Sequence, residues 1–388
     1  MKKIIFNINS LIMGGQEKIA IEYLKLLSDL KKYEILLLID EDNGEKGNYF
    51  LKDIPKDIKY KFIINQTLMN KVNKCRELRR NNLLYKILYN YYLCKRKKER
   101  KKIKNILKNE KYDYFIDFTG ELPIEVTDER VFSWSHLSLK NIKKKKLPEA
   151  LEKIKRVNKF IVLTDEMKEE GIELFPECKD KFIRIYNFFD IEKIKKDSID
   201  NSVLTEREKE LLKEEYFFAC CRLDKQKDID TLIEAYRILK DKYKIKEKLY
   251  IAGEGVEEKR LNLLVKKYGL ENDILFLGLQ RNPYIWMKNS RIFLHSSFRE
   301  GLPTVIIEAL ITNGLVISSD CPTGPREILE NGKSGLLFPV GNEEKLVEEI
   351  LKVLNNEEII KKYKMEAKRR IKDFSKEKIK EDILKLLN

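Results

Sequence analysis

The chain has 388 residues, of which 43% are hydrophobic and 10% aromatic, and its formal net charge is +15. This length is enough for two domains with separate cores, and the composition excludes a disordered chain. The apolar runs are too short for a bilayer span, so we expect no transmembrane helix. The six cysteines show no C-x-x-C spacing, so we expect reduced thiols in a cytoplasmic protein rather than a zinc or redox site.

Most of the excess positive charge lies in the first half of the chain. Residues 52–111 contain 20 Lys and Arg but only 5 Asp and Glu. Within them, Leu, Ile and Tyr residues precede a basic tail, a pattern typical of a helix at a bilayer surface. We therefore predict that residues 78–108 contact an anionic membrane surface. Two alternatives stay open: a helix packed on its own domain, or a general preference for surface lysine.

The predicted elements alternate between short apolar strands and helices. The first starts at residue 4 and is predicted as a strand rather than a secretion signal, because polar residues interrupt it. The strands of the first half are predicted at 4–9, 34–40, 60–64, 112–118, 131–136, 160–164 and 182–188. Those of the second half are predicted at 216–223, 249–255, 274–278, 291–297, 314–320 and 335–340. Several lack polar alternation, as do strands buried on both faces of a parallel sheet.

The polar segment 191–215 is the predicted domain boundary. We predict an α/β protein of two Rossmann-like parallel-sheet domains, 1–190 and 191–388, the second ending in helices. Open sheets of this kind bind ligands beyond the carboxyl ends of their strands, so the expected site is a cleft between facing domains.

One strand-to-helix turn of the second half combines features of an anion site. The strand at 291–297 leads into a turn where Pro303 is predicted to begin a helix, a position that tolerates its missing N–H. The first amides of that helix, near Thr304 and Val305, then bind anions with the help of the helix dipole. Glu300 and Glu308 bracket the turn and can accept hydrogen bonds from hydroxyl groups. The alternative is a surface turn with incidental glutamates.

A second loop, after the strand at 216–223, carries Arg222 and Lys227. A guanidinium fork and an ammonium point charge, five residues apart on a strand's carboxyl end, can converge on one phosphate-type anion. The alternative is solvated surface charge, because isolated basic pairs of this spacing are common.

In this order the pieces resemble glycosyltransferase family 4, a retaining, nucleotide-sugar-dependent family of the GT-B superfamily. The similarity rests on C-R-L-x3-K-D (221–228), I-A-G-E-G (251–255), F-L-G (276–278), E-G-L-P-T-V-I-I-E-A (300–309), P-T-G-P-R-E-I-L (322–329) and N-G-x-S-G-L-L (331–337). Cys221 and Asp228 depart from it, because the family commonly has glycine at both positions.

The resemblance implies roles for these residues. Arg222 and Lys227 would hold the donor diphosphate, Glu300 would contact the transferred sugar, and Glu308 would bind the ribose hydroxyls. The implied donor-binding set is Gly15, Gly253, Leu302, Pro303, Thr304, Val305 and Glu308.

The first half resembles the family more weakly. Gly14 and Gly15 follow the first strand like the family's glycine loop, whose backbone approaches a donor phosphate or the acceptor. A plain strand-to-helix turn is the alternative. His136 ends another strand and is similar to the family's cleft histidine, which contacts the donor sugar. The second histidine, His295, is interpreted as structural.

The implied activity is that of a metal-independent hexosyltransferase without a cofactor. It would move a hexose or N-acetylhexosamine from a nucleoside diphosphate sugar, preferably a UDP-sugar, to a glycan or lipid-linked acceptor in cell-surface polysaccharide synthesis. We expect a cytoplasmic location, peripheral on the inner face of the membrane. A non-catalytic sugar-nucleotide-binding subunit is the alternative.

Other functions fit the sequence less well. A dinucleotide fingerprint would need a third glycine after Gly253 and Gly255, and none follows at the required position. The D-x-D at Asp228 and Asp230 falls at a predicted helix start, where capping explains it better than a metal. A nucleic-acid partner is not expected, because it would leave the paired glutamates without a role.

Overall fold

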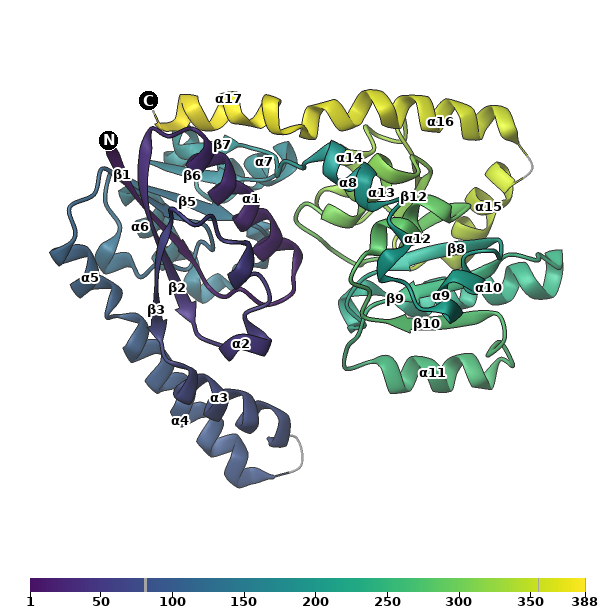
Figure 1. Ribbon diagram of the computed structural model, residues 1–388, viewed down its shortest axis with the longest axis horizontal. Helices are drawn as coiled ribbons and strands as arrows, with labels where there is room; N and C mark the ends of the chain where they lie inside the picture. The colour runs from purple at the N-terminus through teal and green to yellow at the C-terminus, as the bar shows by residue number, and fades with distance from the viewer. Residues whose placement is uncertain (80–81, 355, 388) are drawn as a thin grey trace. The chain divides into compact units, whose positions relative to one another are not determined.

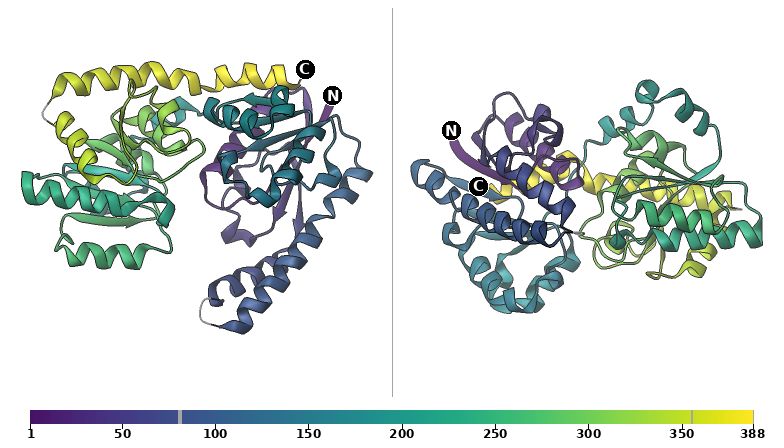
Figure 2. Two further views of the ribbon diagram at one scale, coloured as in Figure 1. Left: turned by 180° about the vertical axis from the view of Figure 1, so that it is seen from behind. Right: turned by 90° about the horizontal axis from the view of Figure 1, so that it is seen from below.

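The computed structural model describes residues 1–79, 82–354 and 356–387, which form two compact units (Figures 1 and 2). The N-terminal unit comprises 1–163, 168–185 and the end of the chain from Asp382. The C-terminal unit comprises 164–167 and 186–381. Among the described residues, no helix is both long and apolar enough to cross a bilayer.

The N-terminal unit is built on a parallel sheet with the strand order β3-β2-β1-β4-β5-β6-β7. Its strands are β1 (Lys2–Ile8), β2 (Tyr33–Glu41), β3 (Lys59–Ile64), β4 (Tyr114–Asp117), β5 (Val131–Ser135), β6 (Lys159–Val162) and β7 (Phe182–Arg184). Its helices are α1 (Gly15–Asp29), α2 (Gly44–Gly47), α3 (Gln66–Leu78), α4 (Leu83–Arg100), α5 (Ile103–Asn109), α6 (Leu147–Arg156) and α7 (Asp165–Leu174), which starts among residues of the other unit. Central strands such as β1 are buried on both faces, as the apolar runs predict.

The C-terminal unit is a second parallel sheet, with the order β10-β9-β8-β11-β12-β13. Its strands are β8 (Tyr216–Cys220), β9 (Lys248–Ala252), β10 (Ile274–Gly278), β11 (Ile292–His295), β12 (Val316–Ser319) and β13 (Leu336–Phe338). Its helices are α8 (Ile191–Asp197), α9 (Glu206–Leu211), α10 (Ile229–Tyr243), α11 (Glu258–Lys267), α12 (Pro283–Asn289), α13 (Thr304–Thr312), α14 (Pro325–Ile328), α15 (Glu343–Leu354) and α16 (Glu357–Arg370). Helix α17 (Lys376–Leu387) begins in this unit and ends in the other.

In both sheets the strand order reverses beside the first strand: β1 lies between β2 and β4, and β8 lies between β9 and β11. At such a point the connections on either side leave in opposite directions, so the carboxyl ends of the strands open into a crevice. The predicted site residues follow these strands: Gly15 comes after β1, Lys227 after β8, and Glu300 after β11.

All thirteen predicted strands are present among the described residues, with ends that differ by a few positions. The predicted two-domain α/β architecture is confirmed. The units divide the chain after Ile185 rather than at 190, and the end of the chain returns to the N-terminal unit. The segment 191–215 forms helices α8 and α9 inside the C-terminal unit rather than a linker.

Two glycines hold the loops at the carboxyl edge of the second sheet close together. A Cβ atom on Gly253, whose φ is +128°, would lie 1.9 Å from the carbonyl oxygen of Cys221. A Cβ atom on Gly324, whose φ is +96°, would lie 2.5 Å from the carbonyl oxygen of Gly301. Because only glycine avoids both the clash and the strain, these positions bring neighbouring loops into backbone contact.

Candidate functional site

The centre of the candidate site is the Glu300 carboxylate, just before helix α13. Its Oε1 atom accepts hydrogen bonds from Lys227 Nζ at 2.6 Å and from Ser297 Oγ at 2.6 Å. His295 Nε2 lies 3.2 Å from the same oxygen, and its Nδ1 lies 2.8 Å from Ser318 Oγ. All three of these contacts with Glu300 involve Oε1, so this oxygen anchors the carboxylate.

The surroundings of Glu300 keep it ionised. Burial by itself would raise the pKa of this carboxyl, but the hydrogen bond with His295 and the charge of Lys227 outweigh it and lower the pKa to about 2. The carboxylate is therefore a fixed negative charge with a lysine ammonium against it. Such a preformed pair can accept from hydroxyl groups and present a cation to an anion in the same place.

The backbone of the Glu300 turn is fixed from behind. Glu300 N–H donates to the carbonyl oxygen of Pro322 at 2.8 Å, and Thr323 Oγ1 donates to the carbonyl oxygens of Glu300 and Gly301 at 3.1 and 3.0 Å. This loop places the first residues of α13, Thr304 and Val305, at a partly exposed helix start. The first amides of a helix lack intrahelical acceptors, so this end suits an anion.

Pro303 and Leu302 lie in the same turn. Helix α13 begins at Thr304, one residue later than predicted, and Pro303 precedes it with φ −66° and ψ 101°. Leu302 is buried, with 6% of its surface exposed. The correction is small, because a proline before the first helical residue leaves the anion-binding amides in place.

Glu308 lies in α13 and is 6% exposed. Tyr284 from α12 donates a hydrogen bond from its hydroxyl to Glu308 Oε1 at 3.0 Å. The tyrosine orients the carboxylate, so the role predicted for Glu308 depends on a side chain that the sequence analysis did not single out.

Arg222 does not join this cluster in the structure. Its guanidinium pairs with Asp224 at 3.1 Å, and its side chain is 76% exposed. Of the predicted pair, Lys227 contacts Glu300, whereas Arg222 pairs with Asp224. An exposed ion pair of this kind is weak, so it does not lock the guanidinium in place.

The two departures from the family pattern have structural explanations. Asp228 adopts the left-handed conformation, with φ 48° and ψ 49°, which glycine adopts most easily and Asp tolerates better than most residues. It stands at the start of α10, and its carboxylate accepts a hydrogen bond from Thr231 at 2.7 Å. Burial raises the pKa of the Cys221 thiol to about 12, so this side chain is a neutral, small group beside the charged residues.

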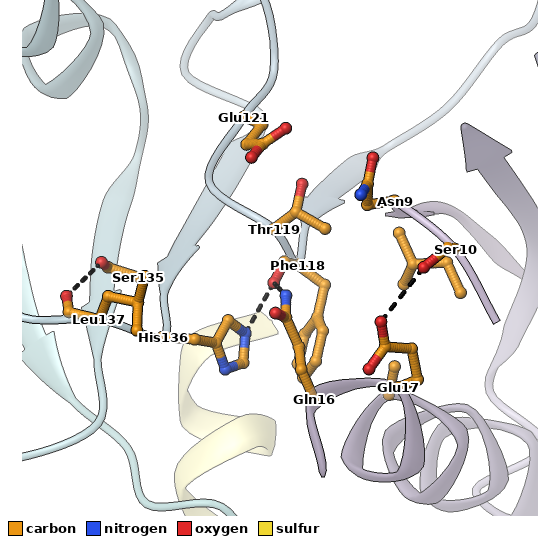
Figure 3. Close-up of a pocket in the computed structure, with 12 residues that line it drawn as sticks. Asn9, Ser10, Gln16, Glu17, Phe118, Thr119, Glu121, Ser135, His136 and Leu137 are labelled. Carbon is orange, nitrogen blue, oxygen red and sulfur yellow. Dashed lines mark hydrogen bonds between the residues drawn. The ribbon is translucent and has the colours of Figure 1, made fainter. Parts of the chain in front are cut away.

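The N-terminal unit has its own pocket, of about 170 Å³, at the carboxyl ends of β1, β4 and β5 (Figure 3). Gln16 Nε2 and His136 Nε2 both reach the carbonyl oxygen of Phe118, at 3.4 and 2.7 Å. On the opposite side, Ser10 Oγ donates to Glu17 at 3.2 Å. The lining residues are Ile8, Asn9, Ser10, Gln16, Glu17, Ala20, Phe118, Thr119, Glu121, Ser135, His136 and Leu137.

His136 is neutral in this pocket. Burial lowers the pKa of its imidazole to about 4, although the Phe118 carbonyl and the charge of Asp117 act in the opposite direction. Because the Phe118 oxygen can only accept, Nε2 carries the proton and Nδ1 is left as an acceptor. The imidazole can thus accept a hydrogen bond from a polar ligand without adding charge. Gly15 opens helix α1 beside the pocket, and the neighbouring Gln16 and Glu17 line it.

Comparison with known sequences identifies the C-terminal half most clearly. Residues 203–370 match the family Glycosyl transferases group 1, a range that contains the Glu300 cluster and α13. A solved structure, Anabaena Alr3699/HepE in complex with UDP and glucose, superimposes with a TM-score of 0.75 at 18% identity over 100% of this chain and 99% of its own. The chain has the GT-B fold. A TarM structure from Staphylococcus aureus, with UDP among its ligands, gives a TM-score of 0.74 at 17% identity over the full length of both chains.

The curated relatives are similar to part of this chain. An N-acetylgalactosamine-N,N'-diacetylbacillosaminyl-diphospho-undecaprenol 4-alpha-N-acetylgalactosaminyltransferase of Campylobacter jejuni is 34% identical over 219 residues, 56% of this chain and 57% of the relative. A poly(ribitol-phosphate) alpha-N-acetylglucosaminyltransferase of Staphylococcus aureus is 26% identical over 240 residues, 61% of this chain and 45% of the relative. The chain thus spans about half the length of these relatives.

The structure adds partners that sequence reasoning missed. His295 was interpreted as structural, yet it contacts the central carboxylate, and Ser297 donates to the same oxygen. Their signal was present in the sequence as polar residues at the end of a buried strand, directly before the Glu300 turn. Tyr284 had no such signal, because it lies 24 residues from Glu308.

Proposed function

We propose that this GT-B protein is a retaining, metal-independent glycosyltransferase. It moves a hexose or N-acetylhexosamine from a nucleoside diphosphate sugar, with UDP as the preferred nucleotide, to a hydroxyl group of a glycan or lipid-linked acceptor. The observation that carries this proposal is the Glu300 carboxylate, held by Lys227 and His295 directly before the N-terminus of α13. The family match over residues 203–370 supports it, and so do the two solved relatives that bind UDP.

Each charged group has a part in the proposed reaction. The amides of Thr304 and Val305 and the Lys227 ammonium bind the diphosphate, and Arg222 joins them by leaving Asp224. Glu300 accepts from the sugar hydroxyls through Oε2, and Glu308 accepts from the ribose. As the acceptor oxygen bonds to the anomeric carbon, the bond to the diphosphate breaks and the nucleotide departs with the electron pair, while the acceptor hydroxyl gives its proton to the departing diphosphate oxygen. The cations and the helix end stabilise the charge that grows on the leaving group.

The N-terminal unit would supply the acceptor side. Its pocket offers several hydroxyl and carboxylate groups, a lining suited to sugar hydroxyls, and the neutral His136 in the same lining keeps its predicted contact with the donor sugar. The names of the two curated relatives, which act on a diphospho-undecaprenol-linked glycan and on poly(ribitol-phosphate), support a cell-surface glycan or a lipid-linked acceptor. We place the enzyme in the cytoplasm, peripheral on the inner membrane face, with residues 78–108 toward the lipid.

The test combines donor binding with turnover. A thermal-shift panel of UDP-, GDP- and ADP-sugars should select one nucleotide, and that donor should be consumed in the presence of a suitable acceptor. Glu300→Ala and Arg222→Ala should abolish transfer without loss of the fold, whereas Glu271→Ala, an exposed residue of the same unit, should retain it. Full activity in either of the first two variants contradicts the proposal. Donor binding without consumption would instead indicate a non-catalytic sugar-nucleotide-binding subunit.

A further inference from the structure

Helices α3 and α4 form an antiparallel pair that extends away from the sheet of its own unit (Figures 1 and 2). Helix α4 has no buried residue, although its first half is rich in Leu, Ile and Tyr. A soluble protein seldom leaves a helix face of this composition without a partner.

The side chains of α4 divide into two opposite faces. One faces α3 and the sheet: the Arg79 guanidinium lies 4.2 Å from the Tyr89 ring centre, and Lys71 Nζ lies 5.9 Å from that of Tyr92. Farther along this face, Arg96 pairs with Glu41, at the carboxyl end of β2. The spacing of three and four residues between these contacts is that of one helix face.

The other face is apolar at the far end of the pair and basic toward the sheet. Leu84, Ile87 and Tyr91 are 60%, 60% and 59% exposed, and Leu83 beside them is 72% exposed. Lys95 and Lys98, on the same face and nearer the sheet, are exposed as well. At a rise of about 1.5 Å per residue, this stripe runs for roughly 20 Å along the helix.

We propose that this outer face of α4 docks on an anionic lipid bilayer. The side chains Leu84, Ile87 and Tyr91 enter the interface between headgroups and acyl chains, and Lys95 and Lys98 lie against anionic headgroups. Charge complementarity selects this partner, because a second copy of the chain would bring the same lysines together, whereas the inner membrane face is negative. This inference rests on the proposed function for its biological setting and identifies, within the predicted segment 78–108, the face of α4 that contacts lipid; residues 80 and 81 of that segment lie outside the described part of the chain.

The opposite face explains why docking helps the reaction. Arg100, at the base of α4, pairs with Asp40 at 2.5 Å and with Glu121 at 2.9 Å, and Glu121 lines the pocket of the N-terminal unit. The base of α4 is thus joined by ion pairs to the sheet and to the pocket wall, so docking through α4 would hold the pocket near the bilayer. A lipid-linked acceptor has its reactive sugar at a fixed distance from the membrane, which this arrangement matches.

Flotation with vesicles tests the docking without donor or acceptor. The full chain should float with phosphatidylcholine vesicles that contain about 30% phosphatidylglycerol, and at least about fivefold less with phosphatidylcholine alone. In the variant L84S/I87S/Y91S the fraction of protein bound to vesicles should be about tenfold lower. The matched control V256S/L263S/M365S removes three equally exposed apolar side chains of the C-terminal unit and should bind like the parent chain.

A charge pair of variants completes the test. Lys95→Gln with Lys98→Gln should lower binding to anionic vesicles by about tenfold, whereas Lys242→Gln with Lys266→Gln, an equal loss of charge in the C-terminal unit, should leave it unchanged. Cys94 is exposed and lies on the same face, so it can carry an environment-sensitive dye. The emission of this dye should shift to the blue with anionic vesicles. This measurement reports docking even if the triple variant folds poorly.

Several outcomes overturn the inference. They are the absence of vesicle binding by the parent chain, equal binding by the triple variant and its control, or a dye that does not respond. Sedimentation that shows a dimer broken by L84S/I87S/Y91S would also overturn it, by assigning the face to a second copy. Loss of transfer to a water-soluble acceptor would contradict the proposed function alone, since flotation requires neither substrate.

Discussion

The two units carry charged groups at the carboxyl edges of their sheets in different ways. In the C-terminal unit one oxygen of the Glu300 carboxylate is contacted by Lys227, His295 and Ser297. In the N-terminal unit several carboxylates meet several cations, and the members of this network are Asp40, Glu41, Asp117, Glu121, Arg96, Arg100 and Lys153. The first arrangement leaves groups available to a ligand, whereas the second uses its charges to fix α4 and α6 to the sheet.

The same contrast shows in the pKa values of the two central carboxyls. Burial would raise the pKa of both. At Glu300 the hydrogen bond and the nearby cation win and lower it to about 2, whereas at Asp40 burial wins over Arg100 and Asn7 and raises it to about 6. The surroundings of Glu300 thus favour its ionised form, whereas the surroundings of Asp40 disfavour the ionised form of that carboxyl. The difference can be tested by removing each partner in turn.

The largest effect is expected at Glu300. Glu300→Gln keeps the size of the side chain but removes the charge that orients Lys227, so transfer should fall by about a thousandfold, or about 4 kcal/mol in transition-state stabilisation. Steady-state turnover of the selected donor measures this, with the circular dichroism spectrum as a check of folding. His136→Gln, in the pocket of the other unit, should cost less, and equal losses would remove the distinction between the units.

Breaking the scaffold network should cost stability rather than chemistry. Arg100→Ala leaves Asp40 buried without its cation, so the free energy of unfolding should fall by about 3 kcal/mol. The double variant Asp40→Asn with Arg100→Gln removes both charges and should recover most of this loss. Urea unfolding measures both, and Arg130→Ala, which breaks the exposed pair with Asp128, serves as the control with a loss below about 1 kcal/mol. A double variant as unstable as Arg100→Ala would contradict this account.

The two carboxyls should give stability profiles of opposite sign. Glu300 has a pKa of about 2 against a model value of 4.5, so its stabilising contribution is present above pH 4.5 and is lost as pH falls toward 2. Asp40 has a pKa of about 6 against 3.8, so the folded state holds its proton more tightly, and stability is lost as pH rises from 3.8 to 6. The change in the free energy of unfolding from each carboxyl is about 3 kcal/mol at most.

Unfolding free energies between pH 3 and 7 test these signs. The Glu300→Gln variant should lack the acid-side loss, and the Asp40→Asn variant should lack the decline between pH 3.8 and 6. If both variants retain the parent's pH profile, the two carboxyls do not have the environments described.

The smallest effect is expected at Asp228, which occupies a position where the family pattern commonly has glycine. Asp228→Ala keeps the left-handed backbone and loses the Thr231 hydrogen bond, so it should destabilise the chain by about 1–2 kcal/mol. Asp228→Gly relieves the backbone while losing the same bond, so it should stay within about 0.5 kcal/mol of the parent. Thermal unfolding of the two variants measures the difference, and the reverse order would show that backbone strain is unimportant here.

Much of the fold and part of the site could be predicted before the structure. The apolar runs marked every described strand, because strands buried on both faces need continuous hydrophobic sequence. The Glu300 turn was also predicted, since its residues are consecutive and their types suit a strand-to-helix turn. The Arg222–Asp224 ion pair was not predicted, because the partner of an exposed arginine depends on loop geometry rather than on sequence spacing, and the predicted role of Arg222 at the diphosphate stays a prediction.

By itself the sequence determined the alternation of strands and helices, the two-unit α/β plan and the position of the anion-binding turn, because each depends on residues close together in the chain. Only the tertiary structure decided which charges meet. Lys227 reaches Glu300 across 73 positions, Arg100 reaches Asp40 across 60, and burial by segments distant in sequence sets whether each carboxyl keeps its proton. The physical reason is that desolvation and ion pairing act through space, so chain order alone does not reveal their balance.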